Sequence, residues 1–391
     1  MAEENRENEK PIRAKRATKR VLCAGVIVIL IVLIGCFLWA TNTLMSRSAD
    51  KRLAAIEAAR AIPDSENAAI IYNLLMESYD EGSFSTSFLD RETDSLTRHR
   101  PWLSKGYPEL ANWLKTHEST ISALLQASKK KQCRFPINLG PQEMSNRMNR
   151  LAATRQWAFL LIRSANNDIA EGRIDTGLEK HLCLIQMAKH IQQQPVMIDY
   201  LVGIAIEALA SHGMARFIIE DNPTEKHLEI IEAALPQTKN NWSKEWSTVL
   251  EVERLYAKKV PGSLNWLSFW WLRSKKDTAV INRVHEQYLR LLTRRRGNRI
   301  LIALRRYKNK TGHWPQSLDQ IKSSLSKETL TDPHNNGSFV YKLTDEGFKV
   351  YSKGPNNIDE DGRYKQGADD WTIWPAYGIK DKNPRENTND E

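Results

Sequence analysis

The segment 151-LAATRQWAFLLIRSANNDIAEGRIDTGLEKHLCLIQMAKHIQQQP-195 contains two runs of helical periodicity separated by a short polar break. The first run ends near Glu171 and Gly172, and the second begins near Asp175 and ends at Pro195. Apolar residues spaced by three and four positions mark one face of an amphipathic helix, and glycine and proline commonly end one. The segment therefore predicts a helical hairpin. Because no repeat of about 34 residues follows it, it does not predict a repeat array.

Helical periodicity continues on both sides of this hairpin, so we expect residues 45–296 to form an all-α domain. Within it, residues 196–219 are nearly all apolar and either cross a membrane or form a central buried helix. Asp199, Glu207, His212 and Arg216 favour the buried helix, because each is costly in hydrocarbon.

Two carboxylates of that segment are candidate catalytic groups. Asp199 and Glu207 are eight residues apart, which places them about 80° apart around a helix. Such a pair either performs acid–base chemistry or forms ion pairs with arginines.

The overall composition is that of a globular protein. The chain has 391 residues, a formal net charge of +10 and 27% charged residues. Its densest basic cluster lies at 294–299, but no zinc-finger spacing or RNA-binding aromatic motif accompanies it, so we expect no nucleic-acid partner. Cys133 and Cys183 either form a disulfide or remain buried thiols.

Residues 21-VLCAGVIVILIVLIGCFLWA-40 predict a transmembrane signal anchor. A helix of this length spans about 30 Å, the thickness of the hydrocarbon layer of a bilayer. The preceding residues 1–20 form a basic tail, which favours a cytoplasmic N-terminus under the positive-inside rule. We therefore expect a single-pass protein whose membrane partner is the bacterial inner membrane and whose bulk is extracytoplasmic.

Two alternatives for this segment involve cleavage. Leu33-Ile34-Gly35-Cys36 resembles a lipobox, although apolar residues continue after the cysteine. A type IV prepilin start would need a glutamate at the fifth mature position, and residues 21–40 contain none.

A second membrane-related feature is 264-LNWLSFWWLRSKK-276, in which tryptophans precede basic residues. This composition suits either a membrane-interface segment beside the anchor or the core of a helical bundle.

The C-terminal part, residues 297–378, has a different pattern. A basic helix from near Asp277 to Tyr307 leads into it, and Phe339–Leu343 and Phe348–Tyr351 read as two strands joined by a tight turn. We expect a small α+β module with a β-hairpin, followed by a disordered tail at 379–391.

The order of motifs in this module resembles the C-terminal head of the major pseudopilins of type II secretion. It is also similar to bacterial membrane-anchored helical proteins that carry the same tail. The matching residues are Gly312, Trp314, Pro315, Ser317, Leu318, Asp332, Pro333, Tyr351, Ser352, Gly354, Pro355 and Asn356. The resemblance covers about 70 residues and implies a bacterial envelope protein.

The resemblance also implies a structural calcium site in the acidic loop 351-YSKGPNNIDEDGRYKQGADDW-371. It assigns Asn356 to the first ligand position and Asp369 and Asp370 to the last acidic pair. Asp359 and Asp361 are further candidates, because calcium takes six to eight oxygen ligands. No histidine or cysteine lies in the loop, which favours calcium over transition metals. The alternative is a solvated turn closed by side-chain-to-backbone hydrogen bonds.

The chain carries no nucleophile elbow, P-loop, dinucleotide fingerprint or zincin motif. We therefore expect a mainly α, non-enzymatic scaffold protein that binds an envelope protein. The alternatives are a component related to type II secretion and an envelope hydrolase that uses carboxylates of the helical domain.

Overall fold

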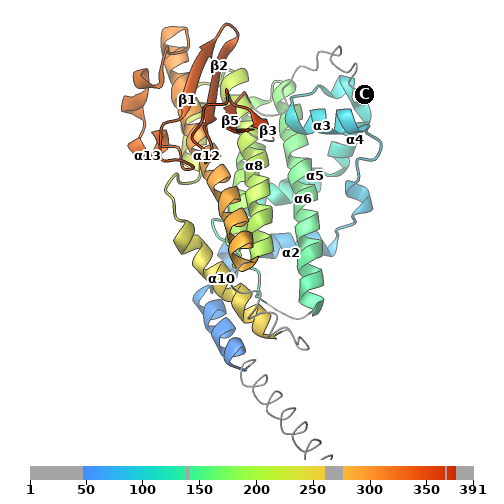
Figure 1. Cartoon of the computed structure of the whole chain (residues 1–391). Coiled ribbons are helices and arrows are strands. Elements are labelled where there is room, and N and C mark those ends of the chain that lie inside the picture. The colour runs from blue at the N-terminus through green and yellow to red at the C-terminus, as the bar shows by residue number, and fades with distance from the viewer. Residues whose placement is uncertain (1–46, 138–140, 260–275, 366–367, 376–391) are drawn as a thin grey trace, which may run out of the picture. The chain divides into compact units, whose positions relative to one another are not determined.

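The computed structural model describes residues 47–137, 141–259, 276–365 and 368–375 (Figure 1). They divide into two compact units. Residues 47–59, which are helical, and residues 253–259 belong to the first unit, and the other described residues form the second. The predicted anchor at 21–40, most of the tryptophan-rich segment and the C-terminal tail lie outside the described residues.

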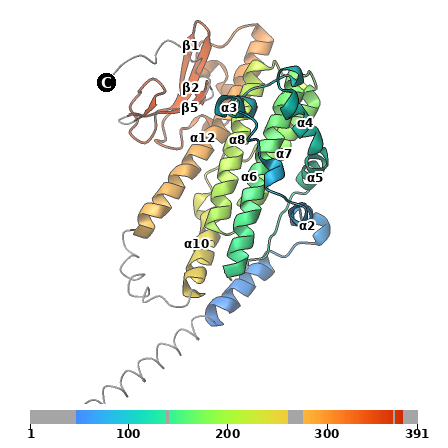
Figure 2. The same cartoon turned by 90° about the vertical axis from the view of Figure 1, so that its right-hand side faces the viewer.

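Four long helices form the centre of the larger unit: α6 (Pro141–Ala170), α7 (Ile174–Gln192), α8 (Met197–Glu220) and α12 (Lys276–Thr311). Helix α7 packs between α6 and α8, and α8 packs against α12 (Figures 1 and 2). The shorter α-helices are α2 (Ala69–Glu77), α3 (Arg91–His99), α4 (Pro108–Thr116), α5 (Glu118–Ser128), α9 (Glu225–Ala234), α10 (Trp242–Lys259) and α13 (Lys327–Leu330). Single turns of 3-10 helix cover Asp64–Glu66, Gly82–Phe84, Ser104–Gly106, Leu318–Gln320 and Lys322–Ser324.

The predicted helical hairpin is confirmed as α6 and α7. Gly172 adopts φ +79° between them, a conformation that glycine reaches without steric cost. The backbone N–H of Arg173 donates to the carbonyl of Asp168 at 2.8 Å and closes the turn. The second helix ends at Gln192, three residues before the expected proline.

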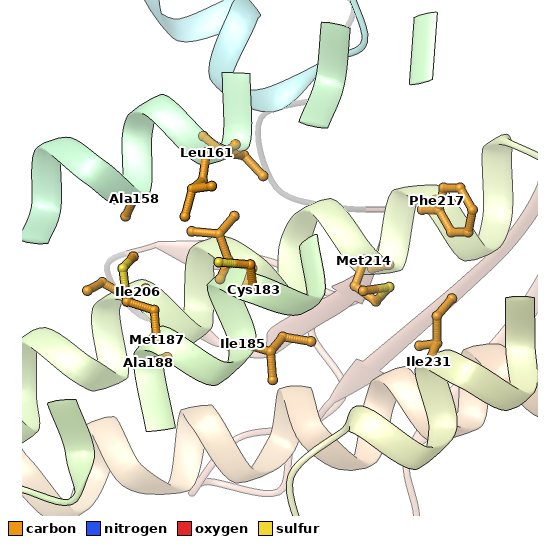
Figure 3. Packing of buried hydrophobic residues seen from close by; sticks show 14 of the residues in the cluster. Ala158, Leu161, Cys183, Ile185, Met187, Ala188, Ile206, Met214, Phe217 and Ile231 are labelled. Carbon is orange, nitrogen blue, oxygen red and sulfur yellow. The ribbon is translucent and has the colours of Figure 1, made fainter. Parts of the chain in front are cut away.

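A large part of the core lies where α6, α7, α8 and α9 face one another (Figure 3), and the same cluster of buried residues continues into α12 and the C-terminal sheet. Leu161, Ile185 and Phe217 are among its buried side chains. Cys183 and Cys133 are also buried and both are free thiols, so the described chain contains no disulfide between them. Burial of these side chains removes apolar surface from water and is the main stabilising term.

The apolar segment at 196–219 is confirmed as a central helix, α8. Among the described residues it is the one helix long and apolar enough to cross a membrane, and 61% of its most apolar window is buried within the protein. Its neighbours α7 and α12 account for that burial.

The C-terminal module contains a three-stranded antiparallel sheet with strand order β1-β2-β5. Strands β1 (Val340–Thr344) and β2 (Gly347–Ser352) are the predicted hairpin, with Tyr341 opposite Val350. Strand β5 (Trp371–Trp374) and the small ribbon of β3 (Tyr364–Lys365) and β4 (Ala368–Asp369) were not predicted. These strands have two to four residues, too few to show an alternating pattern.

Helix α12 joins the bundle to the sheet without interruption, passing through Gly297, where the sequence changes character. A Cβ atom on Gly297 would lie 2.5 Å from Cγ2 of Ile373 in β5. The missing side chain therefore allows β5 to lie directly on the helix.

Candidate metal centre

Three acidic side chains of the C-terminal module converge on one point. One carboxylate oxygen from each of Glu360, Asp369 and Asp370 lies within 4.8 Å of the others. The short β3–β4 ribbon brings them together, because it pairs Tyr364 with Asp369, directly before Asp370 and β5. Asp370, the residue before β5, is completely buried.

Backbone hydrogen bonds fix the orientation of these carboxylates. Oδ2 of Asp370 accepts from the N–H groups of Glu360 at 2.9 Å and Gly362 at 2.8 Å. Oε2 of Glu360 accepts from the N–H of Asp369 at 2.9 Å. The loop is therefore closed by side-chain-to-backbone bonds, as the alternative of a polar turn anticipated.

Two enclosed oxygens are not used by this network. Oδ1 of Asp369 and Oδ1 of Asp370 are buried and accept no hydrogen bond from the described residues. Burial raises the pKa of Asp370, and the nearby charge of Glu360 acts in the same direction. An enclosed carboxylate oxygen without a donor is costly, and a cation bound there would remove that cost.

The pKa of Glu360 shifts in the opposite direction. Partial burial acts to raise it, but hydrogen bonds from Asn356 and from the backbone outweigh that effect and lower it. Glu360 is thus an ionised member of the cluster. It was not among the predicted ligands, because the pseudopilin resemblance pointed to positions on either side of it.

Asn356, the predicted first ligand, supports the cluster from outside it. Its side-chain amide donates to Oε1 of Glu360 at 2.8 Å, and its backbone N–H donates to Oδ2 of Asp369 at 3.2 Å. Its own Oδ1 accepts from the N–H of Ile358 at 2.7 Å. Asn356 therefore positions two of the three carboxylates.

Asp359 and Asp361 do not join the group. Asp359 accepts a 2.7 Å hydrogen bond from the hydroxyl of Tyr351, which is the main cause of its lowered pKa. Asp361 lies 3.1 Å from the ammonium groups of both Lys342 and Lys349, and these two lysines lower its pKa. These ion pairs hold the acidic loop against the β1–β2 hairpin.

The two candidate catalytic carboxylates of α8 occupy separate ion pairs with different helices. Asp199 lies 3.5 Å from Arg147 and 3.6 Å from Arg150, both on α6. Glu207 accepts bonds of 2.6 and 2.8 Å from Arg295 of α12. Each carboxylate therefore links α8 to a neighbouring helix.

The basic cluster at 294–299 is largely used inside the protein. Arg296 donates to the carbonyl of Thr238 at 3.1 and 3.0 Å and to that of Thr331 at 2.7 Å. Arg299 donates to the carbonyl of Leu235 at 3.3 Å. These arginines connect α12 by hydrogen bonds to backbone carbonyls of the segments packed beside it.

The arrangement in the acidic loop suits one kind of chemistry: three carboxylates with oxygen atoms only favour a hard divalent cation such as calcium. Remaining ligand positions on such an ion are commonly filled by water or backbone carbonyls. Comparisons of the chain with protein-family models, with curated proteins and with solved structures found no match.

Proposed function

We propose that this chain is a non-enzymatic, single-pass protein of the bacterial envelope whose C-terminal module is stabilised by calcium. The helical domain would bind an envelope protein, and the module would act as a small docking unit. The observation that carries the calcium proposal is the pair of enclosed, unused oxygens of Asp369 and Asp370 beside Glu360.

Support for the tether comes from the uncharged residues 21–40 and the basic tail before them. Support for a binding role comes from the helical domain, whose two buried acids on α8 are occupied by arginines. Asp199 and Glu207 pair with arginines of two different helices, so they do not form the adjacent carboxylate pair that an envelope hydrolase would need.

Calcium binding can be tested directly with terbium, a luminescent ion that takes calcium sites. Trp371 follows Asp370 in the chain and would sensitise a bound ion. We expect calcium-competed luminescence from the full chain in detergent. Replacing Asp370 with Asn should weaken terbium binding by about tenfold or more, because it removes a charged, buried ligand.

Asp361→Asn is the matched control. It also removes one negative charge from the acidic loop, but at a residue outside the converging triad. It should leave terbium binding within about threefold of the parent protein. Equal losses in both variants would show that general negative charge, and not the triad, attracts the ion.

A second candidate is a component of type II secretion, which the order of motifs from Gly312 to Asn356 favours. This candidate predicts processing of the N-terminus by a prepilin peptidase. Sequencing the mature N-terminus distinguishes the two: a chain that starts at or next to Met1 argues against such processing.

A further inference from the structure

Two aromatic side chains next to the acidic triad hold one arginine of α12. The rings of Tyr364 in β3 and Trp371 at the start of β5 lie 5.2 Å apart between centroids and are nearly perpendicular. The guanidinium carbon of Arg290 lies 5.0 Å from the Tyr364 centroid and 4.5 Å from the Trp371 centroid. Arg290 also donates a 2.7 Å hydrogen bond to the hydroxyl of Tyr364. The two rings therefore form a two-walled arginine seat, stabilised by cation–π attraction.

The other contact of Arg290 lies within its own helix. Its Nε donates to Oε1 of Glu286 at 3.0 Å, one turn earlier on α12. This pair orients the guanidinium, but it does not join the helix to the C-terminal module. The hydrogen bond and ring contacts that link Arg290 to the module are therefore those of the arginine seat.

The two rings belong to the same two segments as the triad. Tyr364 lies four residues after Glu360, and Trp371 directly follows Asp370. Between them, the N–H of Gly362 donates to Oδ2 of Asp370 at 2.8 Å and joins the two segments. The spacing of the carboxylates therefore sets the spacing of the rings within a few residues.

Like charges oppose this spacing when no cation is bound. One carboxylate oxygen from each of Glu360, Asp369 and Asp370 lies within 4.8 Å of the others. Carboxylates this close repel one another, and the repulsion pushes the two segments apart. A divalent cation between them replaces the repulsion by attraction and holds the segments together.

We propose that calcium at the triad regulates the seating of Arg290, so that binding of the ion fastens the C-terminal module to α12. The inference rests on the proposed calcium site and adds a consequence of its occupancy. Coupling between two sites is reciprocal, so a seat that calcium strengthens must strengthen calcium binding by the same factor. Within the described residues no hydrogen bond or ion pair joins Arg290 to the triad, which makes Arg290 a positioning residue.

The test measures calcium binding to the full chain in nonionic detergent by calorimetry. Arg290→Met keeps a long side chain, removes the guanidinium and should weaken calcium binding about fivefold or more, the lower end of typical coupling between sites. Simple electrostatics predicts the opposite sign, because loss of a nearby positive charge favours a cation. Arg306→Met is the matched control: this arginine of the same helix pairs with Glu225 and Glu232, and its loss should leave calcium affinity unchanged.

Tyr364→Phe is a milder second variant. It removes only the hydroxyl that accepts from Arg290 and keeps both the ring and the formal charge. It should weaken calcium binding in the same direction as Arg290→Met, by a smaller factor. Because Tyr364 is 43% exposed, this variant tests the coupling even where Arg290→Met does not fold.

Chemical labelling reports on the arginine seat in the parent protein itself. Phenylglyoxal modifies accessible guanidinium groups, and peptide mass spectrometry locates the modified arginines. We expect calcium to protect Arg290 and chelator to expose it, whereas Arg306 should react equally under both conditions.

The outcomes separate this inference from the calcium site on which it rests. A parent protein that binds no calcium would overturn both. Calcium binding that is equally tight in the two seat variants, or tighter in Arg290→Met, would overturn the coupling alone and leave the calcium site in place. Labelling of Arg290 that does not respond to calcium would do the same.

Discussion

At the residue scale, burial keeps several histidines of the helical domain neutral. His181 is completely buried in α7, and neither of its ring nitrogens has a hydrogen bond within the described residues. Burial and, to a smaller extent, the charge of Arg216 together lower its pKa to about 4. Between about pH 6.5, the ordinary pKa of histidine, and pH 4, His181 therefore binds a proton in the unfolded chain but not in the folded chain.

This difference predicts acid sensitivity of folding. The contribution of His181 to stability is fully present above about pH 6.5 and is lost as the pH falls toward 4. We expect the free energy of unfolding to fall between pH 7 and pH 4.5 by roughly 2–3 kcal/mol more in the parent protein than in His181→Leu. Urea titrations of both proteins at the two pH values measure it.

Exposed His313 provides the control, because His313→Gln should keep the pH dependence of the parent. An unchanged pH dependence in His181→Leu would show that carboxylates alone cause the acid sensitivity.

Sequence patterns predicted some of the acidic residues that converge in the C-terminal module. Of the three converging acids, Asp369 and Asp370 were named from the order of motifs and Glu360 was not, whereas Asp359 and Asp361 were named but lie in other contacts. The reason is geometric: which acids converge depends on the pairing of β3 with β4, and such short strands carry no sequence pattern that predicts it.

At the element scale, a buried ion pair joins α8 to α12. The ion pair of Glu207 with Arg295 is almost fully enclosed, with side-chain exposures of 1% and 8%. Gln192 also donates to Glu207 at 2.7 Å. Removal of one member leaves a buried charge, which costs about 3–5 kcal/mol, whereas removal of both can be nearly neutral.

A double-mutant cycle tests this coupling. Glu207→Gln and Arg295→Met should each destabilise the protein by about 3–5 kcal/mol, and the double variant by clearly less than their sum. Arg306→Met, which removes two partly exposed ion pairs, should cost about 1 kcal/mol or less for each pair. Additive losses in chemical denaturation would mean that the two side chains are not coupled.

The contact of α12 with β5 gives a second prediction. Gly297→Ala should destabilise the protein by about 1–3 kcal/mol, because the added methyl group overlaps Ile373. Gly106→Ala, where a Cβ meets no atom within 4 Å, serves as the control. Shortening the neighbour in Gly297→Ala/Ile373→Val should recover part of the loss, and failure to recover any would argue against direct contact at this position.

The longer helices and the first β-hairpin were easier to predict from the sequence than the contacts of single side chains. Apolar periodicity, together with glycine, proline and turn residues, predicts the α6–α7 hairpin, α8 and the β1–β2 hairpin. Strand β5 could not be found in this way, because it has only four residues and pairs with a strand from which the β3–β4 ribbon separates it in the chain.

At the scale of the whole molecule, we propose a tether, a helical domain and a cation-stabilised module in one chain. The tether predicts that the protein stays with the membrane fraction after carbonate washing, and that a chain lacking residues 1–40 does not. Recovery of the full chain in the soluble fraction would contradict the proposed anchor.

The measurement that tests the calcium-stabilised module most directly is a thermal melt of the full chain in detergent, with calcium and then with excess chelator. A ligand that binds only the folded state adds about 2.7 kcal/mol of stability at a hundredfold excess over its Kd. We predict a higher melting temperature with calcium, lost in Asp369→Asn/Asp370→Asn and kept in Asp345→Asn, which removes a charge from the hairpin turn of the same module. Identical melts with calcium and with chelator would contradict the proposal and leave the acidic loop as a polar turn.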